Sequence, residues 1–191
     1  TIRKPIESMN ADKMALIAKE NNICLDDVII HAPYIVNLAR NEKEKHQFAV
    51  DFITTEVIGV HSIGCKYLVL HPGSATDADR DIAIKQVASG INEIFEKTQG
   101  LRTVIALETM AGKGNEVGRN FEEIKQIIDL VNDKTRIAVC LDTCHIHDAG
   151  YDVSDFGDRC VKVNACPPEL TDTNLFDIIL GATASTDSNW Y

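Results

Sequence analysis

Residues 137–142 read Ile-Ala-Val-Cys-Leu-Asp, five apolar side chains followed by a carboxylate. An apolar run of this length is typical of a strand that is buried on both faces of a parallel sheet. Three similar runs precede it, at residues 28–31, 67–71 and 103–108. The four runs begin 39, 36 and 34 residues apart, and each interval is long enough to hold one helix.

Amphipathic segments fill the intervals between these runs. They cover residues 47–61, 77–97 and 120–131, and an earlier helical segment at residues 10–20 has no strand before it. Strand–helix alternation predicts βαβ units and a parallel sheet. We therefore expect an α/β fold of the TIM (β/α)8-barrel type, incomplete, with about four βα units recognisable.

The last part of the chain does not continue this pattern. Residues 154–191 contain one short strand candidate at 160–164 and a short apolar stretch at 175–180, and neither ends in a ligand residue. We expect residues 1–153 to form the partial barrel domain and residues 154–191 a divergent tail whose structure the sequence predicts only weakly. Because the chain does not begin with Met, we also expect it to start inside a longer parent.

Each predicted strand ends in a side chain that can bind a metal ion. These residues are His31, His71, Glu108 and Asp142. For a single strand-end His, a capping or core role is the more common explanation. The carboxyl ends of the strands of a TIM barrel meet on one face, however, where catalytic residues lie. Four such residues on consecutive strands therefore favour a shared metal site.

Composition and charge place limits on the partners of the protein. No apolar run approaches the roughly 18 residues that a membrane-spanning helix needs, so we expect no membrane partner. The six cysteines are irregularly spaced, which favours free thiols in the cytoplasm, or in the nucleus or mitochondrion of a eukaryote. The net charge of -10 disfavours non-specific binding to DNA, although a local positive groove or bound metal ions would change the sign inside a site.

Four stretches together resemble the endonuclease IV family of AP endonucleases. Residues 31–39, His-Ala-Pro-Tyr-Ile-Val-Asn-Leu-Ala, are similar to its first signature, and residues 139–145, Val-Cys-Leu-Asp-Thr-Cys-His, are similar to its second. His-Pro-Gly-Ser at 71–74 and Leu-Glu-Thr-Met-Ala-Gly-Lys-Gly at 107–114 match the same family in order and spacing. The resemblance covers about residues 1–153.

The resemblance implies a zinc-dependent nuclease of base-excision repair. Members of the family are TIM-barrel enzymes that use three zinc ions and a metal-activated hydroxide to hydrolyse the phosphodiester 5′ to an abasic site in double-stranded DNA. Carried over to this sequence, His31 and His71 would bind the first zinc and Glu108 would bridge to the second. Asp142 would bind the second zinc and His145 the third. Glu108 would also have a catalytic role, because it positions the attacking water.

The resemblance also assigns a DNA-binding role to Tyr34 and Ile35. Their side chains match positions that enter the duplex at the lesion when the abasic nucleotide is flipped out. Without the motif, Tyr34 would be interpreted equally well as a residue that packs a loop.

Several family features are not recognisable in this chain. They are the first strand, the third signature (His-x-Asn-Asp/Glu) and the later ligands. The first zinc site would therefore be complete, the second would lack a His and a Glu, and the third would keep only His145. We also expect the strands at 28–31 and 137–142 to have open edges that promote self-association, and the isolated chain to have little endonuclease activity.

Two other interpretations remain open. Xylose-isomerase-like sugar isomerases and epimerases share the architecture and also place Glu, Asp and His at strand ends around a divalent metal. A preference for manganese or magnesium over zinc would favour them. The third interpretation is an inactive truncated barrel that cuts no DNA.

Overall fold

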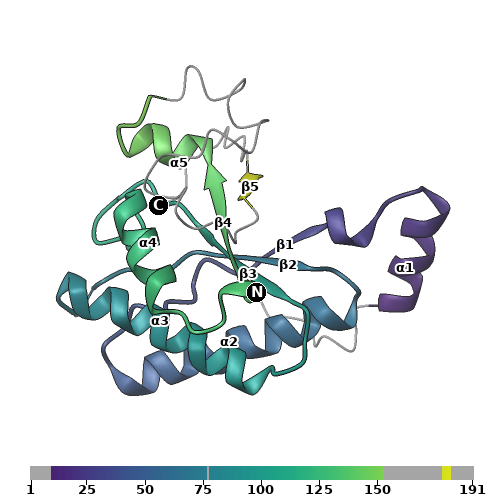
Figure 1. Cartoon of the computed structure of the whole chain (residues 1–191), viewed down its shortest axis with the longest axis horizontal. Helices are drawn as coiled ribbons and strands as arrows, with labels where there is room; N and C mark the ends of the chain where they lie inside the picture. Colours follow the sequence, from purple (N-terminus) through teal and green to yellow (C-terminus); the bar gives the residue numbers. More distant parts are fainter. Residues whose placement is uncertain (1–9, 77, 153–177, 182–191) are drawn as a thin grey trace.

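The computed structural model describes residues 10–76, 78–152 and 178–181. Helices and strands alternate along most of this length (Figure 1). In chain order, the elements are α1 (Ala11–Glu20), a 3-10 turn (Leu25–Asp27), β1 (Ile29–His31), α2 (Lys43–Ser62), β2 (Tyr67–Leu70), α3 (Arg80–Lys97), β3 (Val104–Glu108), α4 (Phe121–Leu130), a 3-10 turn (Lys134–Arg136), β4 (Ile137–Asp142), α5 (Thr143–Asp148) and β5 (Ile178–Gly181).

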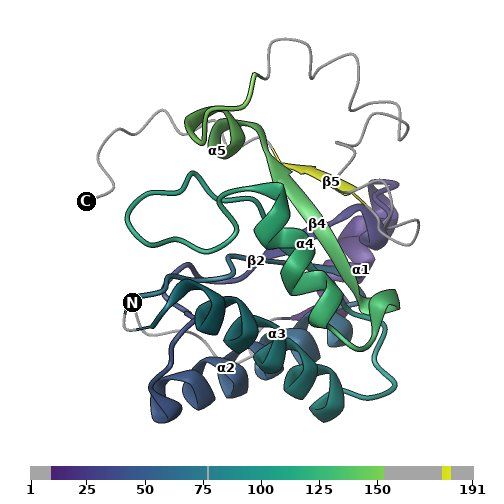
Figure 2. The same cartoon turned by 60° about the vertical axis from the view of Figure 1, so that its left-hand side comes forward.

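The described strands form one parallel sheet in the order β1-β2-β3-β4-β5. Helices α2, α3 and α4 lie side by side and cover one face of this sheet (Figures 1 and 2). The predicted α/β fold of the TIM-barrel type is confirmed, because the four predicted strands and their connecting helices occur within a few residues of their expected bounds.

The continuous apolar runs predicted strands buried on both faces, and this holds for β3 and β4, whereas Ile29 and His31 of β1 are exposed. Alternate side chains, such as Leu68 and Leu107, belong to the large core between the sheet and the helices. The intervening side chains form a second, smaller cluster on the other face, which consists of Val69, Val104, Ala106, Ala138 and Cys140. In β3 and β4 every residue is buried. Packing on both faces of β3 and β4 fixes the backbone at their last residues, Glu108 and Asp142.

The structure corrects the sequence-based prediction at the far edge of the sheet. Ile178–Gly181 pair with β4 as a fifth parallel strand, so the outer edge of residues 137–142 is not open. The strand was not predicted because its three apolar residues form too short a run to be recognised without a pairing partner. Among the described strands, β1 has only β2 as a neighbour. The other strand candidate of the tail, residues 160–164, lies outside the described residues.

A partly buried ion pair fixes the loop between β3 and α4. Arg80 Nε and Nη2 donate to the two carboxylate oxygens of Glu123 over 2.7 and 2.8 Å, and Gly118 N–H donates to the same carboxylate over 2.8 Å. Burial raises the pKa of Glu123, but the Arg80 and Gly118 contacts hold it below its ordinary value. Gly118 has φ +88°, and a Cβ there would lie 2.9 Å from Ile124 Cδ1. The loop that follows Glu108 is therefore held at its far end.

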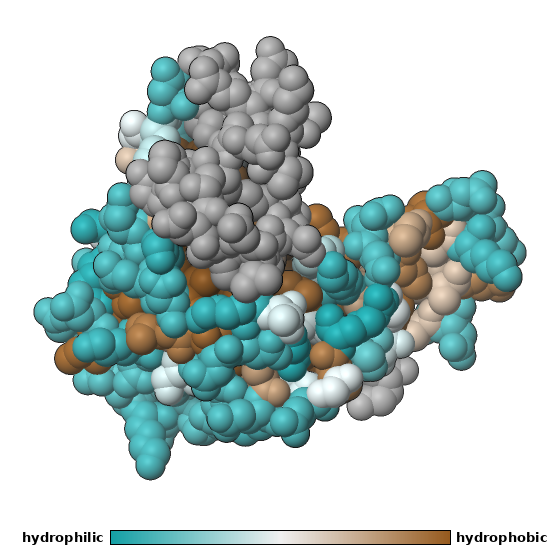
Figure 3. Space-filling view, viewed as in Figure 1, coloured by the Kyte–Doolittle hydropathy of each residue, from teal (hydrophilic) through white to brown (hydrophobic). Residues whose placement is uncertain are grey.

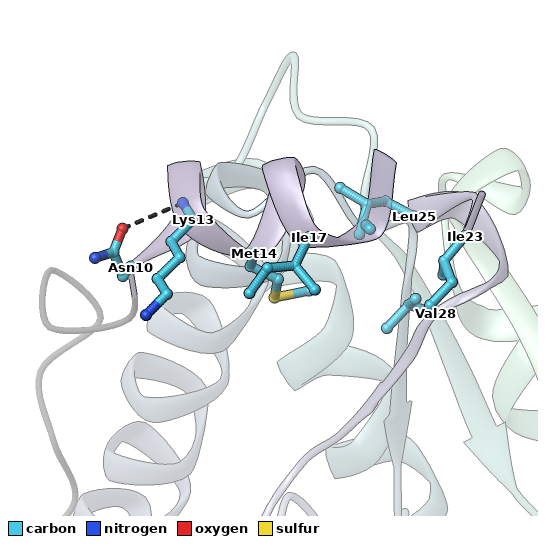
Figure 4. A pocket seen from close by; sticks show the side chains of 8 residues that line it. Asn10, Lys13, Met14, Ile17, Ile23, Leu25 and Val28 are labelled. Carbon is cyan, nitrogen blue, oxygen red and sulfur yellow. Dashed lines mark hydrogen bonds between the residues drawn. The ribbon is translucent and has the colours of Figure 1, made fainter. Parts of the chain in front are cut away.

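The α1 lobe presents apolar surface next to β1 (Figure 3). Leu16, Ile17, Ile23 and Ile29 are 56, 46, 51 and 43% exposed. A pocket lies between α1 and the segment that leads into β1 (Figure 4), and its lining includes Met14, Ile17, Ala18, Ile23, Leu25 and Val28. No helix in the described part of the chain is long and apolar enough to cross a membrane.

Candidate metal centre

The carboxyl ends of four neighbouring strands supply most of the candidate site. His31 is the last residue of β1, Glu108 the last of β3 and Asp142 the last of β4, while His71 follows β2 directly. His145 comes from the first turn of α5, which begins immediately after β4. Because the strands are parallel neighbours, the structure brings these five residues together at one edge of the sheet.

The Glu108 carboxylate lies at the centre of this group. His31 Nε2 and His71 Nε2 lie 2.8 and 3.2 Å from the same oxygen, Oε2, and His145 Nδ1 lies 3.2 Å from Oε1. The Glu108 residue is 3% exposed, whereas the side chains of His31, His71 and His145 are 44, 21 and 27% exposed. The imidazoles therefore lie between the carboxylate and solvent, in positions from which they can share a cation with it.

The backbone orients the ring of His31. Its Nδ1 lies 2.6 Å from the carbonyl oxygen of Ala32, which can only accept, so Nδ1 carries the proton of this hydrogen bond. In a neutral ring, Nε2 then has a lone pair directed at the Glu108 carboxylate. That arrangement is repulsive unless a proton or a metal ion lies between the two groups. Orientation of a His ring by a backbone carbonyl is common in metal sites.

Asp142 has two roles. Its Oδ1 accepts the backbone N–H groups of Cys144 and His145 over 2.8 and 3.1 Å, so it is the N-cap of α5, and its Oδ2 lies 4.0 Å from His145 Nδ1. Thr109, which follows β3, is hydrogen-bonded to the end of β4 and to α5. Its Oγ1 accepts the N–H of Asp142, and its carbonyl accepts Nδ1–H of His145. The sequence had given Thr109 no role. Its position directly after Glu108, inside the family-like stretch 107–114, was the available signal.

The electrostatics of the site favour positive charge. Burial alone would raise the pKa of Glu108, but hydrogen bonds with His145, His31 and His71 hold it well below its ordinary value. The hydrogen bond with Glu108 raises the pKa of His145 to about 9 against the effect of burial, and Asp142 adds to the increase. The pKa of His31 is raised mainly by its own hydrogen bond with Glu108. The ionised Glu108 carboxylate and the surrounding imidazoles therefore hold protons between them. A metal cation can take the place of these protons.

The donor atoms form two overlapping groups. One consists of His31, His71 and Glu108, and the other of Glu108, Asp142 and His145, and within each group the ligand atoms lie within 4.8 Å of one another. Imidazole nitrogen and carboxylate oxygen are the ligand types that zinc accepts. The residues present therefore fit a metal, and Glu108 is common to both groups.

The loop after β1, which begins directly after the candidate ligand His31, carries two exposed side chains. Tyr34 and Ile35 are 72 and 71% exposed, while Ala32 and Val36 on either side of them are 2 and 4% exposed. His147, two residues after His145, has a side chain that is 69% exposed and lies 3.9 Å from Asp148, outside both groups.

Histidine and carboxylate side chains that converge from the strand ends of parallel βα units define the class, a TIM-barrel protein with a candidate metal centre. A family model described as xylose isomerase-like TIM barrel matches residues 1–183. The Probable endonuclease 4 of Acholeplasma laidlawii is 54% identical over 163 residues, which are 85% of this chain and 55% of that protein. The chain belongs to the xylose isomerase-like TIM-barrel family and, within it, to the endonuclease IV group.

Solved structures of proteins with different names share the fold of this chain equally well. Endonuclease IV from Thermus thermophilus matches with a TM-score of 0.65 at 24% identity, over 96% of this chain and 77% of that one. A D-tagatose 3-epimerase-like protein matches with the same TM-score of 0.65 at 16% identity, over 93 and 77% of the two chains. This chain spans about half the length of the curated relatives that it matches, as the 55% for Acholeplasma laidlawii shows.

Proposed function

We propose that this protein is a zinc-dependent AP endonuclease of base-excision repair, which hydrolyses the phosphodiester 5′ to an abasic site in double-stranded DNA. The observation that carries the proposal is the position of Glu108, which is buried and shared between two groups of candidate ligands at the carboxyl edge of the sheet. The sequence identity with proteins named endonuclease 4 supports the choice of reaction.

Each residue of the centre has a role in this proposal. His31, His71 and Glu108 hold one zinc ion, Glu108 and Asp142 take part in a second site, and His145 contributes to a third. When bound, zinc ions supply Lewis acidity that activates water and stabilises charge on the phosphate. Glu108 is the catalytic residue, since its ionised carboxylate can accept a hydrogen bond from the attacking water at the point where the ligand groups meet.

Tyr34 and Ile35 are proposed to contact the DNA. Two apolar side chains that are more than two-thirds exposed, on a loop beginning at a metal ligand, can enter a duplex where a base is missing. With a net charge of -10, the chain cannot attract phosphate over its whole surface. Zinc ions in the site would supply positive charge locally and draw the backbone of the damaged strand to the centre.

The second candidate function is that of a sugar isomerase or epimerase. It is favoured by the fold likeness to the D-tagatose 3-epimerase-like protein, which equals the likeness to endonuclease IV. A sugar enzyme would use a manganese or magnesium ion in place of zinc. An exposed Tyr34–Ile35 pair is harder to explain in such an enzyme, because a small sugar would leave both side chains in solvent.

The deciding experiment uses the protein at its full natural length. A labelled duplex with one tetrahydrofuran abasic analogue is incubated with protein that was stripped of metal and reloaded with zinc, manganese or magnesium. We expect zinc-dependent incision 5′ to the analogue, no incision of the undamaged duplex and no incision by Glu108→Gln. The exposed variant Glu96→Gln is the matched control. Epimerisation of a ketose by the reloaded protein, with no incision, would contradict the proposal.

A further inference from the structure

The exposed pair Tyr34–Ile35 lies on a tight turn with buried ends. Val36 N–H donates to the Pro33 carbonyl over 3.3 Å, which places Tyr34 and Ile35 at the two corners of a four-residue turn. Because Ala32 and Val36 are buried, the backbone on both sides of the corners is held by the core. The turn therefore presents Tyr34 and Ile35 to solvent from a backbone that is anchored on either side.

Asn37 connects this turn to the neighbouring loop. Its Nδ2 donates to the Ser74 carbonyl over 2.9 Å, and its Oδ1 accepts the Ser74 N–H over 3.0 Å and the Ala39 N–H over 2.9 Å. The side-chain amide therefore pairs with Ser74 as a backbone amide would in a sheet, with one bond given and one received. Ser74 lies three residues after the candidate ligand His71, and Asn37 lies three residues after the exposed Tyr34.

Gly73 makes this contact possible. It has φ +117°, and a Cβ at this position would lie 2.2 Å from Asn37 Oδ1. Any other residue would push the amide away from Ser74. The stretch that begins at His31 and the stretch that begins at His71 are far apart in the sequence. They are nevertheless in direct contact through Asn37, Gly73 and Ser74.

The connection extends to the third loop. Val117 N–H donates to the Gly73 carbonyl over 2.9 Å, and Ala75 N–H donates to the Asn115 carbonyl over 2.9 Å. This third loop follows Glu108. The three loops that begin at His31, His71 and Glu108 are thus hydrogen-bonded to one another in sequence order. Asn37 is the partly buried side chain between the first two, and an exposed contact from Arg40 to Thr76 lies beyond it.

We propose that Asn37 is a positioning residue for lesion recognition. By pairing with Ser74 it fixes the Tyr34–Ile35 turn relative to the strand ends that carry His31 and His71. It touches neither metal nor DNA, and it acts through the two exposed side chains. This inference rests on the proposed function, since it gives a purpose to the turn only if the turn enters damaged DNA.

The test compares Asn37→Ala with a matched control, Asn92→Ala, in the protein at its full natural length. Asn92 also bridges two backbone groups with its side-chain amide, the Leu130 carbonyl at 3.0 Å and the Asn132 N–H at 2.7 Å, but it lies on α3, away from the three loops. For Asn37→Ala we expect KM for the abasic duplex to rise about 10- to 100-fold, the effect of losing two or three hydrogen bonds, with kcat and zinc content unchanged. Asn92→Ala should leave KM unchanged.

Two further variants separate positioning from a general loss of structure. In a background of Tyr34→Ala with Ile35→Ala, adding Asn37→Ala should raise KM no further, because the side chains through which it acts are gone. If Asn37→Ala does not fold, Asn37→Asp serves in its place, since it keeps the acceptor Oδ1 and replaces the donor to the Ser74 carbonyl by a carboxylate oxygen that repels it. An independent rise in KM in the Tyr34/Ile35 background, or zinc loss in proportion to the KM change, would overturn the proposal.

The substrate preference of the wild-type protein separates a failure of the proposed function from a failure of the role of Asn37. If it shows no preference for the abasic duplex over an undamaged one, the proposed function fails and the role of Asn37 fails with it. If the preference is present and Asn37→Ala retains all of it, only the role of Asn37 is refuted.

Discussion

Replacing Glu108 by Gln tests the metal centre most directly, because the two side chains have nearly the same shape. Glu108 is 3% exposed and belongs to both ligand groups, so the substitution removes one of three protein ligands from each. It also removes the charge that the imidazoles of His31, His71 and His145 face at 2.8, 3.2 and 3.2 Å. Removing one partner of a buried ionic contact costs about 3–5 kcal/mol. At about 1.4 kcal/mol per factor of ten, zinc affinity should fall by roughly two to four orders of magnitude.

A competition titration against a chromophoric zinc chelator measures this affinity in the apoprotein, and circular dichroism checks that the variant is folded. Glu96→Gln makes the same chemical change at an exposed position of α3 and should bind zinc as the wild type does. A folded Glu108→Gln protein with the zinc affinity of the wild type would refute the assignment of Glu108 as the shared ligand.

Three further outcomes are expected. Tyr34→Ala should weaken binding to an abasic duplex and leave the zinc content intact; equal zinc loss would show a structural Tyr. Glu123→Gln should lower the free energy of unfolding by ~2 kcal/mol, less than for a fully buried pair because Arg80 is 25% exposed. Since the pKa of Glu123 is lowered on folding, this difference should be present above pH ~4.3 and disappear as pH falls through the folded pKa; a pH-independent difference would contradict it. The 191-residue chain should self-associate through β1 and show little endonuclease activity, and Ile29→Lys should shift it towards monomer in size-exclusion chromatography; a wild-type monomer with chelator-sensitive incision would refute this.

Four of the strands and the residues at their ends could be predicted from the sequence because each strand leaves a continuous apolar run. The run 137–142 coincides with β4, and the run 28–31 differs from β1 by one residue. A parallel sheet then fixes which ends lie together, so the meeting of His31, Glu108 and Asp142 followed from topology alone. The distances between these side chains could not be predicted from the topology. That His31 and His71 face the same oxygen of Glu108 depends on rotamers and on the Ala32 carbonyl, neither of which a pattern encodes.

Other features depend on contacts between segments that are distant in sequence. The pairing of β5 with β4 joins residues about forty positions apart, and the pairing of Asn37 with Ser74 spans 37 positions. Neither leaves a periodic signal. Asp142 was predicted as a ligand, but its second role as the N-cap of α5 requires the helix to begin at the next residue, which the strand pattern did not reveal.

An epimerase-like protein and an endonuclease share this fold equally well, so any difference in function must come from outside the sheet. Strand ends supply the candidate metal ligands, and the loops that follow them shape what can approach. In this chain the loop after β1 exposes Tyr34 and Ile35 while its flanks are buried and Asn37 is bonded on both sides. Holding two apolar side chains in water on a fixed turn is unfavourable unless a partner covers them. A sugar is too small to do so, whereas the stacked bases beside an abasic site provide an apolar surface of the required kind. The loop, more than the sheet, favours the nuclease.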